Sequence, residues 1–330
     1  MRVLVTGGAG FIGLHLAKYL AAENKNAVII CDNLFRGQMD NDFRGLIKQS
    51  NVKFIDIDLT NKEELSKLGR DFDIVYHLAA INGTKYFYEM PHEVLRTNVL
   101  SLINILDWLA GSSCKKMVWT SSSETYAGAA TITKIPIPTP EEVPLAISDV
   151  FNPRFSYAGS KIIGELLCLN YAKAYGFNIS IVRPHNIYGP RMGYEHVIPQ
   201  FIMRIIRRES PFKIYGGDQS RAFCFVEDFV KAINLVTESP KTNMQIINIG
   251  NNKEEITIIN LARRMFDLFD FHPPLEVLPP PKGSVDRRCP NITKLKELVG
   301  YEPQIELDVG LQQTYSWYLR DQGSDTHKSD

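Results

Sequence analysis

Tyr157 and Lys161 stand four residues apart in the segment Tyr-Ala-Gly-Ser-Lys. Positions i and i+4 of a helix lie on one face, so a helix here places the phenol beside the ammonium group. A fixed positive charge makes a phenol easier to ionise than it is in water, where its pKa is about 10. The pair therefore predicts a tyrosine that accepts a proton from a hydroxyl group near neutral pH.

A glycine-rich turn near the start of the chain predicts a dinucleotide site. Gly7, Gly10 and Gly13 follow a short apolar strand, and a helix is expected from Phe11 and Ile12 onward. Glycine permits the tight turn and the close approach of backbone to a diphosphate. The N-terminus of the helix then faces that anion with free N–H groups. Strand, glycines and helix together give the pattern its required context.

Acidic residues at two strand ends extend this nucleotide site. Asp32 ends the second expected strand, where an acid accepts hydrogen bonds from the adenosine ribose and repels a 2′-phosphate. This position favours NAD over NADP, although the nearby Arg36 could reverse the preference. Asp58, followed by Leu59, ends the third expected strand and is placed either to meet the adenine or to cap a helix.

Short apolar strands alternate with helical segments through residue 183. The alternation is typical of βαβ units and predicts an α/β fold with a Rossmann-type doubly wound parallel sheet. Beyond residue 183 prolines and aromatic residues become frequent, which indicates a smaller mixed α/β C-terminal lobe. We expect a dinucleotide-binding domain over 1–183 to which 221–252 returns, a substrate-binding lobe over 184–220 and 253–320, and a polar, frayed tail over 321–330.

Composition limits the classes of partner. The 330 residues include 37 basic and 37 acidic residues, so no net charge favours nucleic acid or an anionic membrane. Five scattered cysteines lack metal-ligand spacing, which indicates reduced thiols in a cytoplasmic protein without a metal. The longest apolar runs are too short for a membrane span.

Further motifs support a family resemblance. They are His77-Leu-Ala-Ala80, Asn98, Thr120-Ser-Ser-Ser-Glu-Thr-Tyr126, Arg183-Pro-His-Asn186, Tyr188-Gly-Pro190, Gly216 to Phe223 and Gly300-Tyr-Glu-Pro303. With the glycine turn, Asp32-Asn33 and the Tyr157–Lys161 pair, they make the chain resemble an extended short-chain dehydrogenase/reductase of the NAD-dependent nucleotide-sugar epimerase/dehydratase family. The motifs span nearly the whole chain in the family's order, and they specify the family rather than the substrate.

The resemblance implies roles for individual residues. Tyr157 is the base toward the 4-hydroxyl of a nucleoside-diphosphate sugar, Lys161 also holds the nicotinamide ribose of NAD, and Ser122, beside Ser123, hydrogen-bonds the 4-oxygen. The implied cofactor contacts are Gly7, Gly10, Phe11, Ile12, Gly13, Asp32, Asn33, Asp58, Leu59, Ala79, Ala80 and Pro184. The implied substrate contacts are Arg183, Asn186, Arg191, Arg221, Arg287 and Arg288. Asn98 is either structural or part of a proton path, and the helices near 93–110 and 156–175 form a homodimer contact.

Glu124 discriminates between reactions. In the family, simple 4-epimerases usually carry a small or uncharged residue here, whereas 4,6-dehydratases and uronate decarboxylases tend to carry glutamate. Once carbon 4 is a ketone, the proton on carbon 5 is acidic and Glu124 could remove it. The alternative is that Glu124 caps a turn or pairs with an arginine. An epimerase or dehydratase is therefore the leading hypothesis, with a uronate decarboxylase or a simple 4-dehydrogenase as alternatives.

Two functions of other kinds remain as alternatives. A non-catalytic NAD-sensing regulatory protein could share the fold, but such proteins usually lack the Tyr/Lys pair. A steroid-type dehydrogenase could also share it, but the arginines of the C-terminal lobe argue against an apolar substrate. The segment from Ile81 to Tyr88 matches no single activity, and His185 is interpreted as a packed histidine.

Overall fold

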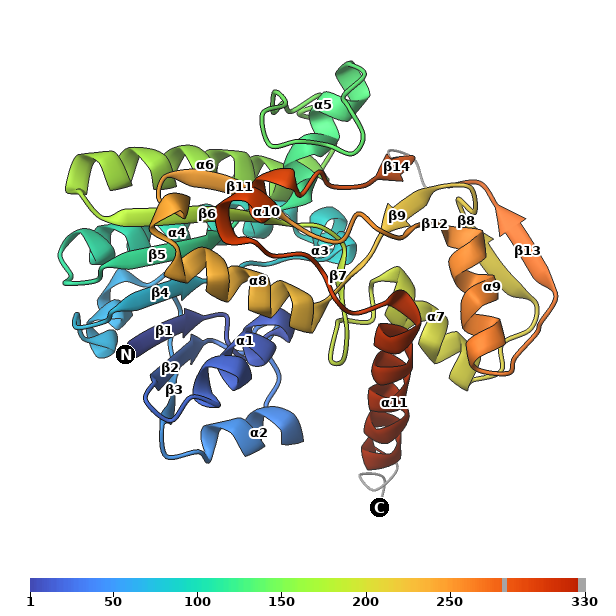
Figure 1. The fold of residues 1–330 in the computed structure, drawn as a ribbon, viewed down its shortest axis with the longest axis horizontal. Helices are drawn as coiled ribbons and strands as arrows, with labels where there is room; N and C mark the ends of the chain where they lie inside the picture. The colour runs from blue at the N-terminus through green and yellow to red at the C-terminus, as the bar shows by residue number, and fades with distance from the viewer. Residues whose placement is uncertain (281–283, 326–330) are drawn as a thin grey trace.

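A parallel sheet of seven strands forms the larger part of the molecule (Figure 1). The computed structural model describes residues 1–280 and 284–325, with side chains described through Asp321. The strand order is β11-β6-β5-β4-β1-β2-β3. The strands are β1 (Arg2–Thr6), β2 (Ala27–Asp32), β3 (Val52–Asp56), β4 (Ile74–His77), β5 (Lys116–Thr120), β6 (Asn178–Pro184) and β11 (Gln245–Ile249). The predicted Rossmann-type doubly wound sheet is confirmed.

The order of the strands places a crevice at the centre of the sheet. From β1 the chain moves through β2 to β3 on one side, and then returns to β4 on the other side of β1. In open parallel sheets, ligands bind outside the carboxyl ends of the strands at such a reversal. The glycine turn follows β1, and residues 78–81 follow β4, so both lie at this point.

Helices cover both faces of the sheet, and alternate strand residues enter separate cores. On β1, Val3 and Val5 pack in the core that includes α1 (Phe11–Ala21) and α8 (Val226–Glu238). Leu4 faces the opposite core, formed with α4 (Pro91–Ala110) and α6 (Phe155–Tyr175). This alternation is the period of two expected of a strand that is buried on both faces.

Helices α4 and α6 lie side by side (Figure 1) and position the Tyr157–Lys161 pair. Pro91 occupies the first turn of α4, where its missing N–H costs no hydrogen bond. Leu102, Ile105 and Leu106 of this helix are fully buried, and each such side chain contributes about 1.5–3 kcal/mol when it leaves water. This packing holds the start of α6 at the end of β5.

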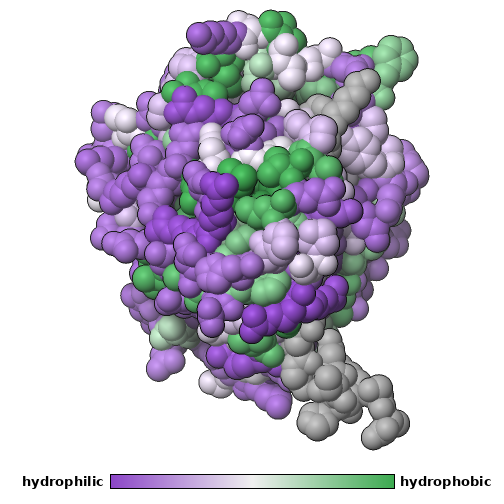
Figure 2. Space-filling view, turned by 90° about the vertical axis from the view of Figure 1, so that its right-hand side faces the viewer, coloured by the Kyte–Doolittle hydropathy of each residue, from purple (hydrophilic) through white to green (hydrophobic). Residues whose placement is uncertain are grey.

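A smaller lobe lies to one side of the sheet (Figure 1). Seen from that side, the surface is largely hydrophilic with a central hydrophobic area (Figure 2). The lobe contains α7 (Val197–Ile206), β8 (Phe212–Tyr215), β9 (Ser220–Ala222), β12 (Glu255–Thr257), α9 (Ile258–Leu268), β13 (Leu275–Leu278) and β14 (Arg287–Arg288). β9 lies between β12 and β14, and the short β7 (Ile187–Tyr188) pairs with β10 (Cys224–Phe225) near the sheet.

The remaining elements are mostly short. They are α2 (Asn41–Ile47), the 3₁₀ turn η1 (Lys62–Leu68), α3 (Thr84–Glu89), the 3₁₀ turn η2 (Ser123–Tyr126), α5 (Ala127–Ile132), the 3₁₀ turn η3 (Pro240–Thr242), α10 (Thr293–Val299) and α11 (Leu307–Asp325). In Figure 1, α5 and the chain beside it project from the sheet domain. α3 lies within the segment that matched no single activity.

The end of the chain differs from the sequence-based prediction. Residues 321–325 belong to α11 and are not a frayed tail, whereas residues 326–330 lie outside the described part. Leu307, Leu311, Thr314 and Tyr318 are buried at helical spacing. Thr314 and Gly310 interrupt the apolar pattern of this helix, and the helix was not predicted.

Candidate active site

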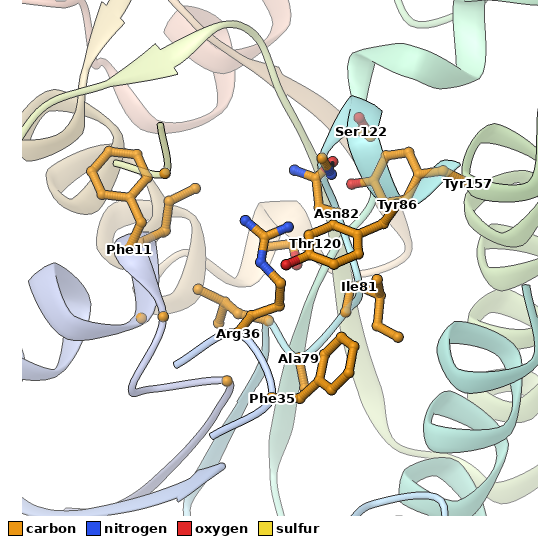
Figure 3. Close-up of a pocket in the computed structure, with 18 of the residues that line it drawn as sticks. Phe11, Phe35, Arg36, Ala79, Ile81, Asn82, Tyr86, Thr120, Ser122 and Tyr157 are labelled. Carbon is orange, nitrogen blue, oxygen red and sulfur yellow. Dashed lines mark hydrogen bonds between the residues drawn. The ribbon is translucent and has the colours of Figure 1, made fainter. Parts of the chain in front are cut away.

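A cavity of about 1000 Å³ runs along the carboxyl ends of the strands, between the sheet and the smaller lobe (Figure 3). All the sequence-predicted cofactor residues line it. They are Gly7, Gly10, Phe11, Ile12, Gly13, Asp32, Asn33, Asp58, Leu59, Ala79, Ala80, Tyr157, Lys161 and Pro184. Ser122, Ser123, Glu124, Asn186, Arg191, Arg221 and Arg288 line the same cavity. Residues far apart in the sequence therefore meet in one site.

The glycine turn fits a bound diphosphate. Gly7 has a φ of +69°, and a Cβ there would lie 2.7 Å from the Ala79 nitrogen. A Cβ on Gly13 would lie 2.2 Å from the Gly7 carbonyl oxygen. Neither position accepts a side chain, so the turn is compact and the N-terminus of α1 opens onto the cavity.

Asp32 ties the adjacent loop to this turn. Its carboxylate accepts hydrogen bonds from the Ala9 N–H at 3.1 Å and the Leu34 N–H at 2.8 Å, and burial raises its pKa. The Arg36 guanidinium extends elsewhere, over the Tyr86 ring at 4.7 Å. The arginine that could have favoured NADP therefore stacks on a ring of the segment that follows β4, and Asp32 keeps the arrangement that suits NAD.

Tyr157 and Lys161 are buried near the start of α6. Lys161 Nζ donates to the Thr120 carbonyl oxygen at 2.7 Å and lies 5.6 Å from the centre of the Tyr157 ring. The Tyr157 hydroxyl faces Ser122, which acts to lower the pKa of the phenol (Figure 3). Phe87 of α3 stacks on the Tyr157 ring, with 4.9 Å between centres and 16° between planes. The phenol is thus fixed between an aromatic ring and a serine.

Burial dominates the ionisation of this pair. It raises the pKa of Tyr157 well above its ordinary value, and Ser122 only partly opposes that rise. Burial also lowers the pKa of Lys161 to about 8. Desolvation, and not the Lys161 charge, therefore governs the ionisation of Tyr157, with Ser122 and Arg36 as the groups that oppose the rise.

Glu124 forms a cluster with two arginines, which we call the Glu124 cluster (Glu124, Arg154 and Arg288). One carboxylate oxygen lies 2.8 Å from Arg288 Nη1 and the other 2.9 Å from Arg154 Nη2. Burial opposes ionisation of Glu124, but Arg288 and then Arg154 outweigh it and lower the pKa to about 2. A carboxylate with so low a pKa is a weak base, so the geometry favours the arginine-paired interpretation of Glu124 over the carbon-5 base.

The local chain explains why these groups meet. Ser122 caps η2, and its hydroxyl oxygen accepts a hydrogen bond from the Glu124 N–H at 3.1 Å. Arg154 immediately precedes α6, three residues before Tyr157, and Arg288 arrives on β14 of the smaller lobe. The cluster therefore joins three separate segments beside the Tyr157–Ser122 pair.

Two arginines predicted to contact substrate lie outside the cavity lining. Arg183 is buried and donates to the Glu165 carboxylate at 2.8 and 2.6 Å and to the Tyr126 hydroxyl at 2.6 Å. Arg287 is half-exposed and donates to the Glu255 carboxylate at 2.7 and 2.8 Å. Because neither side chain lines the cavity and both pair with protein carboxylates elsewhere, the structure corrects these two predictions.

Arg191 lines the cavity, but its donors are also occupied. It forms an ion pair with Asp40 and donates to the carbonyl oxygens of Ala9 at 2.7 Å, Gly10 at 3.0 Å and Gln38 at 2.7 Å. These bonds fix the glycine turn from the opposite side of the cavity. Arg191 therefore braces the cofactor turn, which corrects its predicted role as a substrate contact.

Asn186 and Arg221 lead into a neighbouring side cavity of about 390 Å³. Arg221 donates to the carbonyl oxygens of Ser220 at 2.8 Å and Asp286 at 3.2 Å, and burial lowers its pKa to about 10. Tyr215 and Phe223 of the smaller lobe line the side cavity. Aromatic rings beside a half-buried guanidinium suit a planar base joined to an anion.

Asn98 and His185 occupy structural positions. The Asn98 amide accepts from the Ile81 N–H at 2.7 Å and donates to the Ile81 carbonyl oxygen at 3.1 Å, so it holds the segment after β4. His185 is buried, its Nε2 lies 3.0 Å from Asn248 Oδ1, and burial lowers its pKa to about 3. His185 is thus a packed histidine, as the sequence suggested.

Sequence reasoning missed three residues of the site: Arg154, Phe87 and Tyr86. The Arg154–Tyr157 spacing of three places both side chains on one helical face, and that signal was available. Nothing in the local sequence distinguishes Phe87 or Tyr86 from ordinary packing aromatics. Across residues 1–280 and 284–325, no three histidine, cysteine, aspartate or glutamate side chains group as metal ligands, and no helix is long and apolar enough to cross a membrane.

Comparisons with known proteins agree with this site. The profile of the NAD dependent epimerase/dehydratase family matches residues 3–250. The chain belongs to this family. It is an enzyme that uses NAD, and the compact glycine turn with Asp32 fits that cofactor.

Similar proteins narrow the chemistry further. The chain is 35% identical to a UDP-N-acetyl-alpha-D-glucosaminuronate decarboxylase of Bacillus cytotoxicus, over 96% of this chain and 97% of that protein. It is 32% identical to a UDP-glucuronate 4-epimerase of Thermodesulfobacterium geofontis, over 95% of each. The solved UDP-glucuronic acid 4-epimerase of Bacillus cereus, in complex with UDP-glucuronic acid and NAD, superposes with a TM-score of 0.84 at 25% identity, over 97% of this chain and 99% of that chain.

Proposed function

We propose that the protein decarboxylates a UDP-hexuronate after oxidising carbon 4 of the sugar with bound NAD. The observation that carries the proposal is the Glu124 cluster, in which two arginines share one carboxylate and Arg288 lines the cavity with Tyr157 and Ser122, so a net positive charge faces the sugar. Guanidinium groups recognise carboxylates through parallel hydrogen bonds. The similar decarboxylase and 4-epimerases are named for uronate substrates, which supports a carboxylate at this end of the cavity.

The two cavities support one orientation of the substrate. The sugar lies between Tyr157 and the Glu124 cluster, and its diphosphate extends toward Asn186 and Arg221. The base then enters the side cavity lined by Tyr215 and Phe223. Half-buried Arg221 suits the diphosphate because solvent screens its charge only in part.

Oxidation at carbon 4 uses Tyr157, Ser122 and Lys161. Tyr157 takes the proton of the 4-hydroxyl, and Ser122 hydrogen-bonds the same oxygen. Lys161, fixed by the Thr120 carbonyl oxygen, keeps its ammonium group 5.6 Å from the centre of the Tyr157 ring. The glycine turn and Asp32 would hold NAD, which would supply reversible hydride transfer at carbon 4 and a positive charge that favours the phenolate.

The ketone at carbon 4 makes the uronate a β-keto acid. The bond between carbons 5 and 6 breaks, CO₂ leaves, and the electron pair passes into the carbonyl to give an enolate. Tyr157 and Ser122 hydrogen-bond the enolate oxygen. Carbon 5 then takes a proton from solvent. Since Glu124 is ionised and paired, it orients Arg154 and Arg288 and does not carry that proton.

Product analysis tests the proposal. UDP-glucuronate and UDP-glucose are each incubated with the enzyme and NAD, and released CO₂ and product mass are measured. We expect CO₂ and a UDP-pentose from the uronate, and no decarboxylation of the neutral sugar. A product that retains the carboxylate would contradict the proposal.

A 4-epimerisation of the same uronate is the second candidate. The similarity to the Bacillus cereus 4-epimerase over nearly both chains favours it. The Tyr157–Ser122 pair serves both reactions, because each begins by oxidising carbon 4. In an epimerisation, the 4-keto sugar would rotate within the cavity of about 1000 Å³ and take hydride back on the opposite face of carbon 4.

We also propose that two copies of the chain pair through α4 and α6. Leu95 of α4 and Ile163, Leu166 and Tyr175 of α6 are exposed, with 60% of Leu166 accessible. Apolar side chains at this density on two adjacent helices favour an interface. Light scattering at micromolar concentration should give the mass of a dimer, and a monomer would contradict the pairing.

A further inference from the structure

Arg36 is a charged residue of the cavity that the steps at carbon 4 and the Glu124 cluster do not use. It follows β2, in a loop tied to the glycine turn by the Gln38 N–H, which donates to the Ala9 carbonyl oxygen at 3.2 Å. Its side chain points into the middle of the cavity, between Phe11 and Tyr86 (Figure 3). It thus reaches from the cofactor-binding turn toward the other wall.

Three residues, Gly83, Gly193 and Tyr86, surround the guanidinium group of Arg36. A Cβ on Gly83 would lie 2.8 Å from Arg36 Nη1, and one on Gly193 would lie 3.3 Å from Nη2. Gly83 also has a φ of +119°, which favours glycine. The Tyr86 ring supports the guanidinium at 4.7 Å from its centre. Two glycines and an aromatic ring are the residue types that allow an arginine to lie here.

The guanidinium group of Arg36 has one hydrogen-bond donor without an acceptor. Among the described residues, Arg36 Nη1 is buried without a hydrogen-bond partner, and so is Glu195 Oε2. Glu195 also lines the cavity, with 3.9 Å between its Oε2 and Arg36 Nη2, an ion pair beyond hydrogen-bond length. A buried donor without an acceptor is costly, whereas a phosphate oxygen would satisfy it with a strong, charge-assisted bond.

We propose that Arg36, paired at long range with Glu195, binds the diphosphate of a nucleotide ligand inside the cavity. The link to the glycine turn, where the N-terminus of α1 opens onto the cavity, favours the dinucleotide as the source of this diphosphate. The sugar nucleotide carries the same group and is the other source. The inference rests on NAD binding by the family and not on the proposed decarboxylation. A cofactor that is regenerated in each cycle gains from such retention.

Binding measurements on Arg36→Ala in the full chain test the proposal. Titration calorimetry with NAD and, separately, with UDP measures the two diphosphates one at a time. We expect the dissociation constant for NAD to rise about tenfold to a hundredfold, as for loss of a charge-assisted hydrogen bond. Arg36→Lys should lie between, because it keeps the charge but loses the planar fork. Arg44→Ala, at an exposed arginine of α2, is the matched control and should bind both ligands normally.

Each outcome of the two titrations either assigns Arg36 to a ligand or overturns the proposal. Weaker NAD binding with unchanged UDP binding assigns Arg36 to the dinucleotide, and the reverse pattern assigns it to the sugar nucleotide. Unchanged affinity for both ligands in a variant with the wild-type melting temperature overturns the proposal. If Arg36→Ala unfolds, Arg36→Lys carries the test through the same titrations. Since no decarboxylation is measured, failure of the proposed function leaves these results intact.

Discussion

The Tyr157–Lys161 pair and the neighbouring Glu124 cluster respond to burial in opposite ways. At the Tyr157–Lys161 pair, burial outweighs the compensating contacts, so the pKa of Tyr157 rises and that of Lys161 falls to about 8. In the Glu124 cluster, two guanidinium groups outweigh burial and hold the pKa of Glu124 at about 2. Burial thus holds the Tyr157 phenol neutral in the first region, whereas the second region keeps its charges.

This difference separates the two tasks of the site. Proton transfer needs a group whose charged and neutral forms are close in energy once ligands are bound. Recognition of a carboxylate needs a positive field that does not change during turnover. We therefore assign the oxidation at carbon 4 to the Tyr157 region and the fate of carbons 5 and 6 to the Glu124 cluster.

Tyr157→Phe should have the largest effect. Loss of the hydroxyl removes the proton acceptor, and turnover should fall by a factor of about 10² to 10⁴. Binding of UDP, measured by calorimetry, should stay the same because the side cavity is untouched. Full turnover in this variant would remove the Tyr157 region from the chemistry.

Arg288→Ala should selectively impair substrate recognition by the Glu124 cluster. The variant loses the nearer guanidinium of Glu124, and kcat/KM for a UDP-uronate should fall about a hundredfold. Arg287→Ala is the matched control, because Arg287 pairs with Glu255 outside the cavity lining. Equal effects of the two variants would show that the cluster has no special part in recognition.

Phe87→Leu sharpens the account of Tyr157. Removing the stacked ring should lower kcat by about fivefold, the value of an aromatic pair. It should also admit water, so the apparent pKa of Tyr157 in the pH–rate profile should move down toward its ordinary value. Lower activity with an unchanged pH profile would instead indicate a purely structural role for Phe87.

Glu124→Gln has the smallest predicted effect. The effect is a change in how the free energy of unfolding depends on pH. Glu124 has a lower pKa in the folded state than in the unfolded state, so its contribution is present above about pH 4.5 and is lost as pH falls toward about 2. The stability difference between wild type and variant should therefore shrink by about 1 kcal/mol between pH 7 and pH 4. Urea unfolding at the two pH values measures it. A constant difference would contradict the ion pairing.

The sequence predicted what local patterns encode. The sheet, the glycine turn and Asp32 follow from short apolar strands and fixed spacing, and the structure brings them together. The partners of Arg183, Arg191 and Arg287 were not predictable in this way. Their carboxylates at Glu165, Asp40 and Glu255 come from distant segments, and an arginine that meets a protein carboxylate looks the same in sequence as one that meets a phosphate.

Turnover of UDP-glucuronate in deuterated water tests the division of tasks most directly. Product analysis by mass spectrometry and NMR follows carbon 5 and the carboxylate together. We predict a UDP-pentose with one deuterium at carbon 5 and one CO₂ released per turnover, because the enolate takes its proton from solvent. A 4-epimer that retains its carboxylate and carries no deuterium at carbon 5 would contradict the assignment of the Glu124 cluster.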